Sequence, residues 1–220
     1  MNSPRVAAII PAWNEEETIT QVVSTVARSS WIQEVIVISD GSTDATAHRA
    51  RAAGATVYEM PTNIGKGEAM WFGLQKTNAT VLVFLDADLR GLTSDHLEQL
   101  VHPVVSGSRA MNVGLRDRGR LLTSLSRHLP LISGERALWR LVMEQIHPTY
   151  LRGFMVEVAL NYFCRSHRLS YGAVELVGLS IRRKYEKVGW PRAVLQYAQM
   201  AFQVAKAIVI VRVAHLRGKF

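Results

Sequence analysis

The sequence contains one cysteine, Cys164, in 220 residues. A single thiol excludes an intramolecular disulfide framework and a cysteine zinc cluster, and it suits a reducing compartment. No stretch reaches the roughly 18 consecutive apolar residues of a membrane-spanning helix, and no apolar secretory signal is evident near the N-terminus. We therefore expect a cytoplasmic protein, either free or peripheral on the inner face of a membrane.

Two common nucleotide-binding signatures are also missing. No G-x-G-x-x-G follows the first apolar run, which weighs against a dinucleotide oxidoreductase. The segment N-I-G-K-G at 63–67 is not a Walker A loop, because Met60 stands where glycine is needed and Gly67 follows the lysine in place of Ser or Thr. The Gly- and Arg-rich loop of sugar nucleotidyltransferases is absent too, and Pro11–Glu15 stands in its place.

What is present is a globular composition with an uneven charge distribution. Hydrophobic residues make up 48% of the chain and the net charge is +8. Residues 1–100 carry 12 Asp and Glu against 7 Lys and Arg, whereas 101–220 carry 6 against 19. This asymmetry suggests an acidic half that holds a cation and a basic half that meets phosphates or an anionic membrane. No stacking platform or basic motif supports nucleic-acid binding.

Apolar runs and helical periodicities alternate over the first hundred residues. Strands are expected at 6–10, 35–38, 56–58 and 81–85, and helices at 15–27, 43–53, 65–75 and 94–105, the last with Ser94 as its N-cap. Continuous apolar strands between helices indicate right-handed βαβ units with both sheet faces covered. The expected fold class is therefore α/β, with a Rossmann-like, mostly parallel sheet flanked by helices.

The second half of the chain is less regular. Few periodic signals occur in residues 107–134. Helices are expected at 135–146 and 154–167, and one or two strands within 169–181. A long amphipathic helix is expected at 191–216.

A polar cluster follows each expected strand of the first half: Pro11–Glu15, Asp40–Asp44, Asn63–Gly67 and Asp86–Asp88. The carboxyl ends of parallel strands share one edge of a sheet, where α/β proteins bind their ligands. Asp86-Ala87-Asp88 places two carboxylates directly after a buried strand, which suits Mg²⁺ or Mn²⁺ completed by water and phosphate oxygens. Alone, such a pair would more simply cap a turn; the three neighbouring clusters favour the metal site.

With these clusters in order, the chain resembles the family 2 glycosyltransferases of the GT-A fold, in particular the dolichyl-phosphate mannose synthase and glucosyl-3-phosphoglycerate synthase-like group. The resemblance covers roughly the first 105 residues. It rests on I-I-P-A-W-N-E-E at 9–16, V-I-S-D-G-S-T-D at 37–44, N-I-G-K-G at 63–67 and F-L-D-A-D-L at 84–89. Less specific matches are I-S-G-E-R-A-L at 132–138 and R-G-F-M-V-E at 152–157, which look like acceptor-side segments.

The resemblance implies a nucleotide-sugar site. The donor-binding residues would be Pro11, Ala12, Asn14, Glu15, Asp40, Lys66, Asp86 and Ala87. Asp40 would meet the base and Lys66 the ribose or phosphates. Asp88 would be the principal ligand of Mg²⁺ or Mn²⁺, with Asp86 facing the ribose or the metal. Many relatives add a histidine ligand in a late strand, and no histidine occurs around 180–183.

The acceptor side offers two candidate bases. In an inverting displacement at the sugar C1, a carboxylate must deprotonate the acceptor hydroxyl. Glu135 and Glu157 are the candidates, ahead of Asp117. Glu135 at a helix start could equally be a cap, and Glu157 in an apolar stretch demands a partner or a function. An acceptor that is already a phosphate needs no base, and a retaining mechanism stays open.

Two basic segments have more than one interpretation. Arg116, Arg118 and Arg120 would form either a solvated loop or a lid over an anion. From Arg182 to Phe220 the chain carries nine Lys and Arg against one acidic residue. That helix could contact a membrane, form a homodimer or pack on the core.

We therefore predict a metal-dependent glycosyltransferase with a UDP- or GDP-linked donor and a lipid phosphate, small acid or glycan as acceptor. Residues 1–106 would form the donor half, 107–189 the acceptor-side half of the same domain, and 190–220 the amphipathic helix. The alternatives are a non-catalytic nucleotide-sugar binding module and a sugar nucleotidyltransferase. Binding of nucleic acid is not expected.

Overall fold

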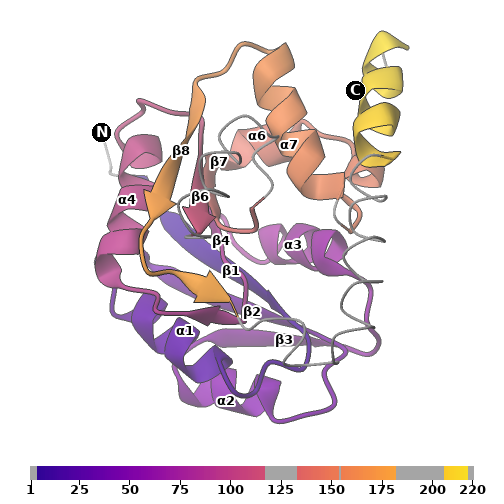
Figure 1. Ribbon diagram of the computed structural model, residues 1–220. Coiled ribbons are helices and arrows are strands. Elements are labelled where there is room, and N and C mark those ends of the chain that lie inside the picture. The colour runs from indigo at the N-terminus through magenta and orange to yellow at the C-terminus, as the bar shows by residue number, and fades with distance from the viewer. Residues whose placement is uncertain (1–3, 117–132, 154, 182–205, 218–220) are drawn as a thin grey trace.

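The computed structural model describes residues 4–116, 133–153, 155–181 and 206–217. A central sheet lies between helices (Figure 1), and its strand order is β3-β2-β1-β4-β7-β6-β8. Its strands are β1 (Val6–Ala12), β2 (Glu34–Asp40), β3 (Thr56–Met60), β4 (Val81–Phe84), β6 (Met111–Arg116), β7 (Arg136–Trp139) and β8 (Tyr171–Leu176). Two short strands, β5 (Leu89–Arg90) and β9 (Ser180–Ile181), pair separately.

Both faces of the sheet are covered, which explains the continuous apolar strands. The helices are α1 (Ile19–Ala27), α2 (Thr46–Ala52), α3 (Lys66–Leu74), α4 (Ser94–Val105), α6 (Arg140–Glu144) and α7 (Met155–Ser166), with a 3-10 helix η1 (Pro148–Leu151). In β1, Ile9 joins the core beneath α3, α6 and α7, whereas the next residue, Ile10, joins the core beneath α1 and α4. Successive side chains of a strand point to opposite faces, so each strand contributes to both cores.

The strand order creates one topological switch point, the place where the order of the strands along the chain reverses its direction across the sheet. From β1 the chain moves outward through β2 and β3, all parallel, and then crosses to β4 on the other side of β1. Only β7 runs against its neighbours β4 and β6 in this sheet, and β8 is parallel to β6. Ligands of such sheets bind beyond the carboxyl ends of the strands at the switch point, here between β1 and β4.

Two expectations from the sequence are wrong in detail, and one strand was not expected at all. The helix expected at 135–146 begins only at Arg140, because residues Arg136–Trp139 pair with β4 and β6 as the antiparallel strand β7. Glu135 therefore precedes a strand and caps no helix. Residues Met111–Arg116 form β6, within a segment that showed few periodic signals. The N-cap of α4 is Thr93, whose hydroxyl accepts a hydrogen bond from the N–H of His96.

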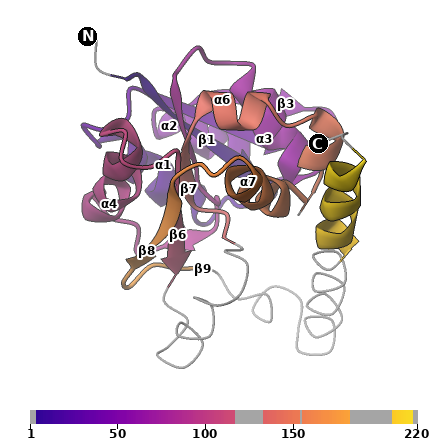
Figure 2. The ribbon, with the colours of Figure 1, turned by 90° about the horizontal axis from the view of Figure 1, so that it is seen from above.

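Several other expectations hold. The expected helix at 154–167 is α7, and the expected strands within 169–181 are β8 and β9. Of the expected C-terminal helix, residues 206–216 are helical and 191–205 lie outside the described residues. This helix lies beside α7 (Figure 2). Its residues Ala207 and Val211 are buried in the core beneath α3, α6 and α7. Within the described ranges, no helix is long and apolar enough to cross a membrane.

Candidate functional site

The turn after β1 is joined to the turn after β2 by side-chain hydrogen bonds. Asn14 has a left-handed backbone (φ 53), which asparagine tolerates better than most residues. Its Oδ1 accepts from the N–H of Thr43 at 2.8 Å, and its own N–H donates to Ser42 Oγ at 3.1 Å. The N–H of Glu15 donates to Thr46 Oγ1 at 2.8 Å. The first two polar clusters thus form one structured rim at the strand ends.

Asp40, at the end of β2, holds the loop that leads into α3. Its buried carboxylate accepts from the N–H of Ile64 at 2.7 Å and from that of Gly65 at 2.9 Å. Gly65 has φ 103, a conformation that side chains other than glycine rarely adopt. Asp40 thereby fixes the start of α3 and the position of Lys66. Its expected contact with a base stays a prediction.

Lys66 bridges the two halves of the chain. Its Nζ lies 2.7 Å from Asp86 Oδ1, just after β4, and 3.1 Å from Glu157 Oε1 on α7. Burial would lower the pKa of Lys66, but the carboxylates of Asp86 and Glu157 outweigh it and raise the pKa above its ordinary value. Burial would raise the pKa of Asp86, and Lys66 and Arg116 instead hold it below its usual range. Lys66 is thus the charged partner that a buried glutamate in apolar surroundings needs.

Arg116 and Glu135 extend this cluster. Arg116, at the end of β6, lies 3.8 Å from Asp86 Oδ2 through Nη1 and 3.5 Å from Glu135 Oε2 through Nε. Burial and the negative charge of Asp86 raise the pKa of Glu135 despite Arg116 and the hydroxyl of Ser133, which donates to it. Its other oxygen, Oε1, accepts no hydrogen bond from the described residues. Arg116 is therefore part of the site; of the segment beyond it, Asp117, Arg118 and Arg120 lie outside the described residues.

Sequence reasoning missed Arg136 and Gly134. Arg136 is wholly buried and donates to the carbonyl of Ser133 at 2.6 Å, and burial lowers the pKa of its guanidinium although Glu157 and Glu135 oppose this. A Cβ on Gly134 would lie 2.3 Å from Asp86 Oδ1 and 2.5 Å from Lys66 Nζ, so any other residue there would have to displace this ion pair. The usable signal was an adjacent Glu and Arg inside an otherwise apolar run. Six charges converge: Lys66, Arg116 and Arg136 with Asp86, Glu135 and Glu157.

The expected metal ligands, Asp86 and Asp88, lie in the turn after β4, and their binding of a cation stays a prediction. Thr18 donates to the carbonyl of Ala87 at 2.8 Å and so ties the Asp86–Asp88 turn to the start of α1. Both oxygens of Asp86 face protein cations, Oδ1 the Lys66 ammonium at 2.7 Å and Oδ2 the Arg116 guanidinium at 3.8 Å, so a metal on Asp86 would have to displace one of them. Among the described residues no group of three or more His, Cys, Asp and Glu could hold a metal. Mg²⁺ and Mn²⁺ suit such a site, because they take their remaining ligands from water and phosphates.

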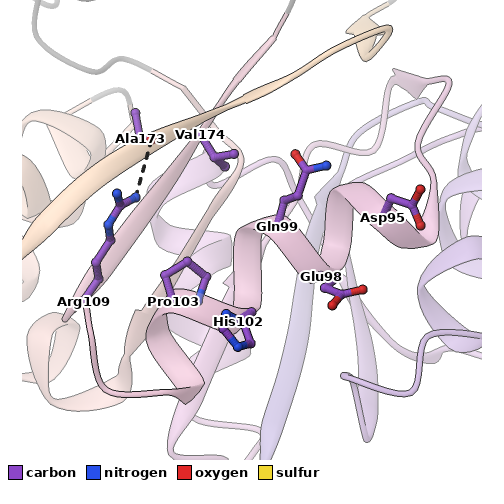
Figure 3. A pocket seen from close by; sticks show the side chains of 8 residues that line it. All are labelled: Asp95, Glu98, Gln99, His102, Pro103, Arg109, Ala173 and Val174. Carbon is purple, nitrogen blue, oxygen red and sulfur yellow. Dashed lines mark hydrogen bonds between the residues drawn. The ribbon is translucent and has the colours of Figure 1, made fainter.

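A separate hollow of about 530 Å³ lies on α4 and β8 (Figure 3), and we do not assign the function to it. Its lining includes Asp95, Glu98, His102 and Arg109, and Arg109 donates to the carbonyl of Ala173 at 3.4 Å. Arg109 precedes β6, so the hollow extends toward the amino end of that strand. The switch point lies at the opposite edge of the sheet.

The fold and the strand-end cluster agree with comparisons to known proteins. The family model described as Glycosyl transferase family 2 matches residues 7–166, and the chain belongs to this family. Glucosyl-3-phosphoglycerate synthase of Mycobacterium tuberculosis is 37% identical over 111 residues, which cover 46% of this chain and 34% of that protein. A 4,4'-diaponeurosporenoate glycosyltransferase of Staphylococcus haemolyticus is 37% identical over 103 residues, 44% of this chain and 27% of that protein.

A solved relative confirms the expected GT-A fold. The crystal structure of the M. tuberculosis glucosyl-3-phosphoglycerate synthase with Mn²⁺, UDP-glucose and phosphoglyceric acid superposes with a TM-score of 0.70 at 30% identity, covering 81% of this chain and 72% of that one. The same protein has been solved with Mg²⁺ and UDP (TM-score 0.69, 28% identity, 81% and 72% coverage). The aligned segment spans about a third of the length of these curated synthases.

Proposed function

We propose that this chain transfers a sugar from a nucleoside-diphosphate sugar, UDP- or GDP-linked, to an acceptor with the help of Mg²⁺ or Mn²⁺ at Asp86 and Asp88. The supporting observation is the convergence of Lys66, Asp86 and Glu157 at the switch point, held by turns that the family motifs build. UDP-glucose with Mn²⁺, found in the solved relative, is the first donor to test. The acceptor classes are a lipid phosphate, a small acid such as that relative's phosphoglyceric acid, and a glycan.

The chain's own residues have distinct roles in this proposal. Pro11, Ala12, Asn14 and Glu15 with Asp40 form the nucleotide end of the site. Lys66 and Arg116 add positive charge on either side of Asp86, where a phosphate oxygen is favoured. A divalent ion, when bound, would neutralise negative charge on the departing nucleoside diphosphate.

For an inverting transfer we assign the role of base to Glu135. Burial and Asp86 raise its pKa, so it has a higher proton affinity than an ordinary glutamate. Its Oε1 is buried and accepts no hydrogen bond from the described part of the chain, so it can accept one from an acceptor hydroxyl that reaches the cluster. Glu157 instead holds the Lys66 ammonium at 3.1 Å and acts as a positioning residue.

Steady-state kinetics separate these two roles. Glu135→Gln keeps the shape of the side chain but removes the base, so we expect kcat to fall by about 10²- to 10⁴-fold with the KM for the donor little changed. Glu157→Gln should chiefly raise the KM for the donor, because Lys66 loses an anchor. A normal kcat in Glu135→Gln would refute the assignment of the base and would favour a retaining route or a phosphate acceptor.

The metal assignment is tested by thermal unfolding with UDP. Mn²⁺ and UDP together should raise Tm in the wild type, by the equivalent of about 2.7 kcal/mol when the ligand is at a hundred times its Kd. Asp88→Asn should lose the part of this shift that depends on Mn²⁺. Glu98→Gln, on the exposed side of α4, is the matched control and should behave as the wild type. A UDP shift that is independent of metal in all three proteins would contradict the metal site.

Product analysis distinguishes the alternatives. Release of UDP from UDP-glucose, or transfer to an acceptor extract, identifies a transferase. Binding without turnover for every UDP- and GDP-sugar would identify a non-catalytic module. Formation of UDP-glucose from UTP and a sugar phosphate would identify a nucleotidyltransferase.

A further inference from the structure

The C-terminal helix, residues 206–216, has an outer face that nothing in the described structure covers. Its inner face is buried on α7, through Ala207, Val211 and Ala214. The His215 ring meets Tyr162 edge to face, with centroids 5.4 Å apart. The outer face is apolar and open: Val209 is 61%, Val213 38% and Leu216 84% exposed. Figure 1 shows this helix at the margin of the molecule, outside α7.

Cations flank this apolar stripe on both sides. At 3.6 residues per turn, Leu216, Val209 and Val213 lie within about 60° of one another around the helix axis. Arg212 lies about 40° beyond the stripe on one side, and Lys206 and Arg217 lie about 20–40° beyond it on the other. All three cations are exposed. An apolar stripe between two rows of long basic side chains is the arrangement of helices that lie in a membrane interface.

We propose that helix 206–216 docks this protein on the surface of a bilayer that contains anionic lipids. Val209, Val213 and Leu216 enter the boundary between head groups and acyl chains. Lys206, Arg212 and Arg217 lay their aliphatic stems along that boundary and pair with lipid phosphates. The inference concerns this surface alone and does not depend on the proposed sugar transfer.

The charges favour a lipid surface over a second copy of the chain. Residues 187–220 contain no Asp or Glu. A two-fold pairing through this helix would bring the cations of both copies together with no carboxylate on the helix to neutralise them, which is unfavourable. Three apolar side chains also make a small patch compared with the roughly 800 Å² per partner of a stable interface. Anionic lipid supplies the missing negative charge, and the net charge of +8 favours such a surface.

Because the apolar stripe is short, membrane binding should need both burial of the apolar side chains and attraction of the cations to anionic lipid. It should therefore be sensitive to salt. We would measure flotation of the whole chain with vesicles of phosphatidylcholine alone and with about one third phosphatidylglycerol, at about 0.1 M and about 1 M salt. Binding is expected only with the anionic vesicles and to be lost at high salt. Arg212→Gln should weaken partitioning about fivefold, as expected for one cation near such a surface. Leu216→Ser should weaken it about tenfold.

Matched controls lie on exposed positions elsewhere. Leu141→Ser on α6 removes a leucine that is 64% exposed, and Arg28→Gln removes an exposed arginine after α1; neither should change flotation. Equal flotation of wild type and Leu216→Ser would overturn the proposal. So would equal binding to neutral vesicles, or a vesicle-free dimer in size-exclusion chromatography that Leu216→Ser converts to a monomer. Circular dichroism of each variant confirms that the fold is kept.

Discussion

At the scale of single residues, Glu135 is a carboxylate whose surroundings favour its protonated form. Burial and Asp86 raise its pKa, and the opposing effects of Arg116 and Ser133 are smaller. Below the ordinary carboxyl pKa this residue is protonated in both the folded and the unfolded chain. As the pH rises, the unfolded chain loses this proton first, so the free energy of unfolding falls until the pH passes the higher pKa of the folded state.

Replacing this carboxylate should therefore stabilise the fold while it removes the proposed base. We expect Glu135→Gln to raise the free energy of unfolding at pH 7 by about 1 kcal/mol, the usual size for a single side chain. The gain should vanish as the pH is lowered through the ordinary carboxyl range, because Glu135 is then neutral in the wild type too. Urea titrations at several pH values, without metal, measure both effects.

Glu157→Gln provides the contrast for that experiment. It removes a partner of the Lys66 ammonium at 3.1 Å, so it should destabilise the fold at pH 7. If both glutamines destabilise the protein equally at neutral pH, the assigned direction of the Glu135 pKa is wrong.

At the scale of elements, the close approach of α3 and η1 depends on one glycine. A Cβ on Gly67 would lie 1.8 Å from the carbonyl oxygen of Leu151 and 2.9 Å from the N–H nitrogen of Gly153. On the same helix, Glu68 accepts a hydrogen bond from the N–H of Gly153 at 3.1 Å. The start of α3, which carries Lys66, is thus fixed against backbone on its far side as well as by Asp40.

Gly67→Ala should force these two elements apart. We expect a loss of about 3 kcal/mol in the free energy of unfolding, because the clash is with backbone that cannot rotate away. Gly107→Ala is the control: a Cβ there meets nothing within 4 Å, although its φ of 76 makes alanine strained. That strain costs roughly 1–2 kcal/mol. Equal losses in chemical denaturation of the two variants would contradict a steric origin.

The elements of the first half could be predicted from the sequence because local patterns and tertiary environment agree there. The runs around Ile9 and Val83 are buried on both faces and read as parallel strands. Residues Arg136–Trp139 carry no such pattern: Arg136 belongs to the strand only because β4 and β6 pair with it. Its charge is tolerated because the site's carboxylates lie nearby, and a local pattern does not show that placement.

The candidate site was likewise predictable where local sequence patterns mark its residues, and not where strand pairing alone places them. Asp86 and Lys66 were expected from strand-end positions and from the resemblance, and Glu157 was expected as a candidate base in an apolar stretch. Arg116 was expected as a loop residue and is instead in the cluster. It lies there because β6 ends at the same sheet edge as β4, which depends on a strand pairing that spacing along the chain does not reveal.

At the scale of the whole molecule, one sheet and the cores on both of its faces run through both halves of the chain. The strand β4 of the first half pairs with β7 of the second through Val81–Phe84. The core beneath α3 joins Ile9 and Leu82 with Leu138 and Val156. The boundary expected at residue 106 therefore lies within one sheet, and the division of roles on either side of it stays a prediction.

Residues 1–106 alone should therefore not fold. Without β7, the fragment exposes the edge of its most apolar strand and loses half of one core. We expect no cooperative urea transition by circular dichroism for the fragment, and one coincident transition by circular dichroism and tryptophan fluorescence for the whole chain. A fragment that unfolds cooperatively with native helix content would show that the halves are independent.

The position of Lys66 has a consequence for how the two ends of the site influence each other. One ammonium serves a carboxylate of the first half and a carboxylate of the second, at 2.7 Å and 3.1 Å. A donor that draws this ammonium toward its phosphates also changes the charge felt by Glu157, on the side where an acceptor would bind. Thermodynamic reciprocity then requires that an acceptor engaging Glu157 changes the affinity for the donor by the same factor. In the proposed transfer, the shared lysine would make donor and acceptor cooperative ligands of one charge network, with no need for a moving domain.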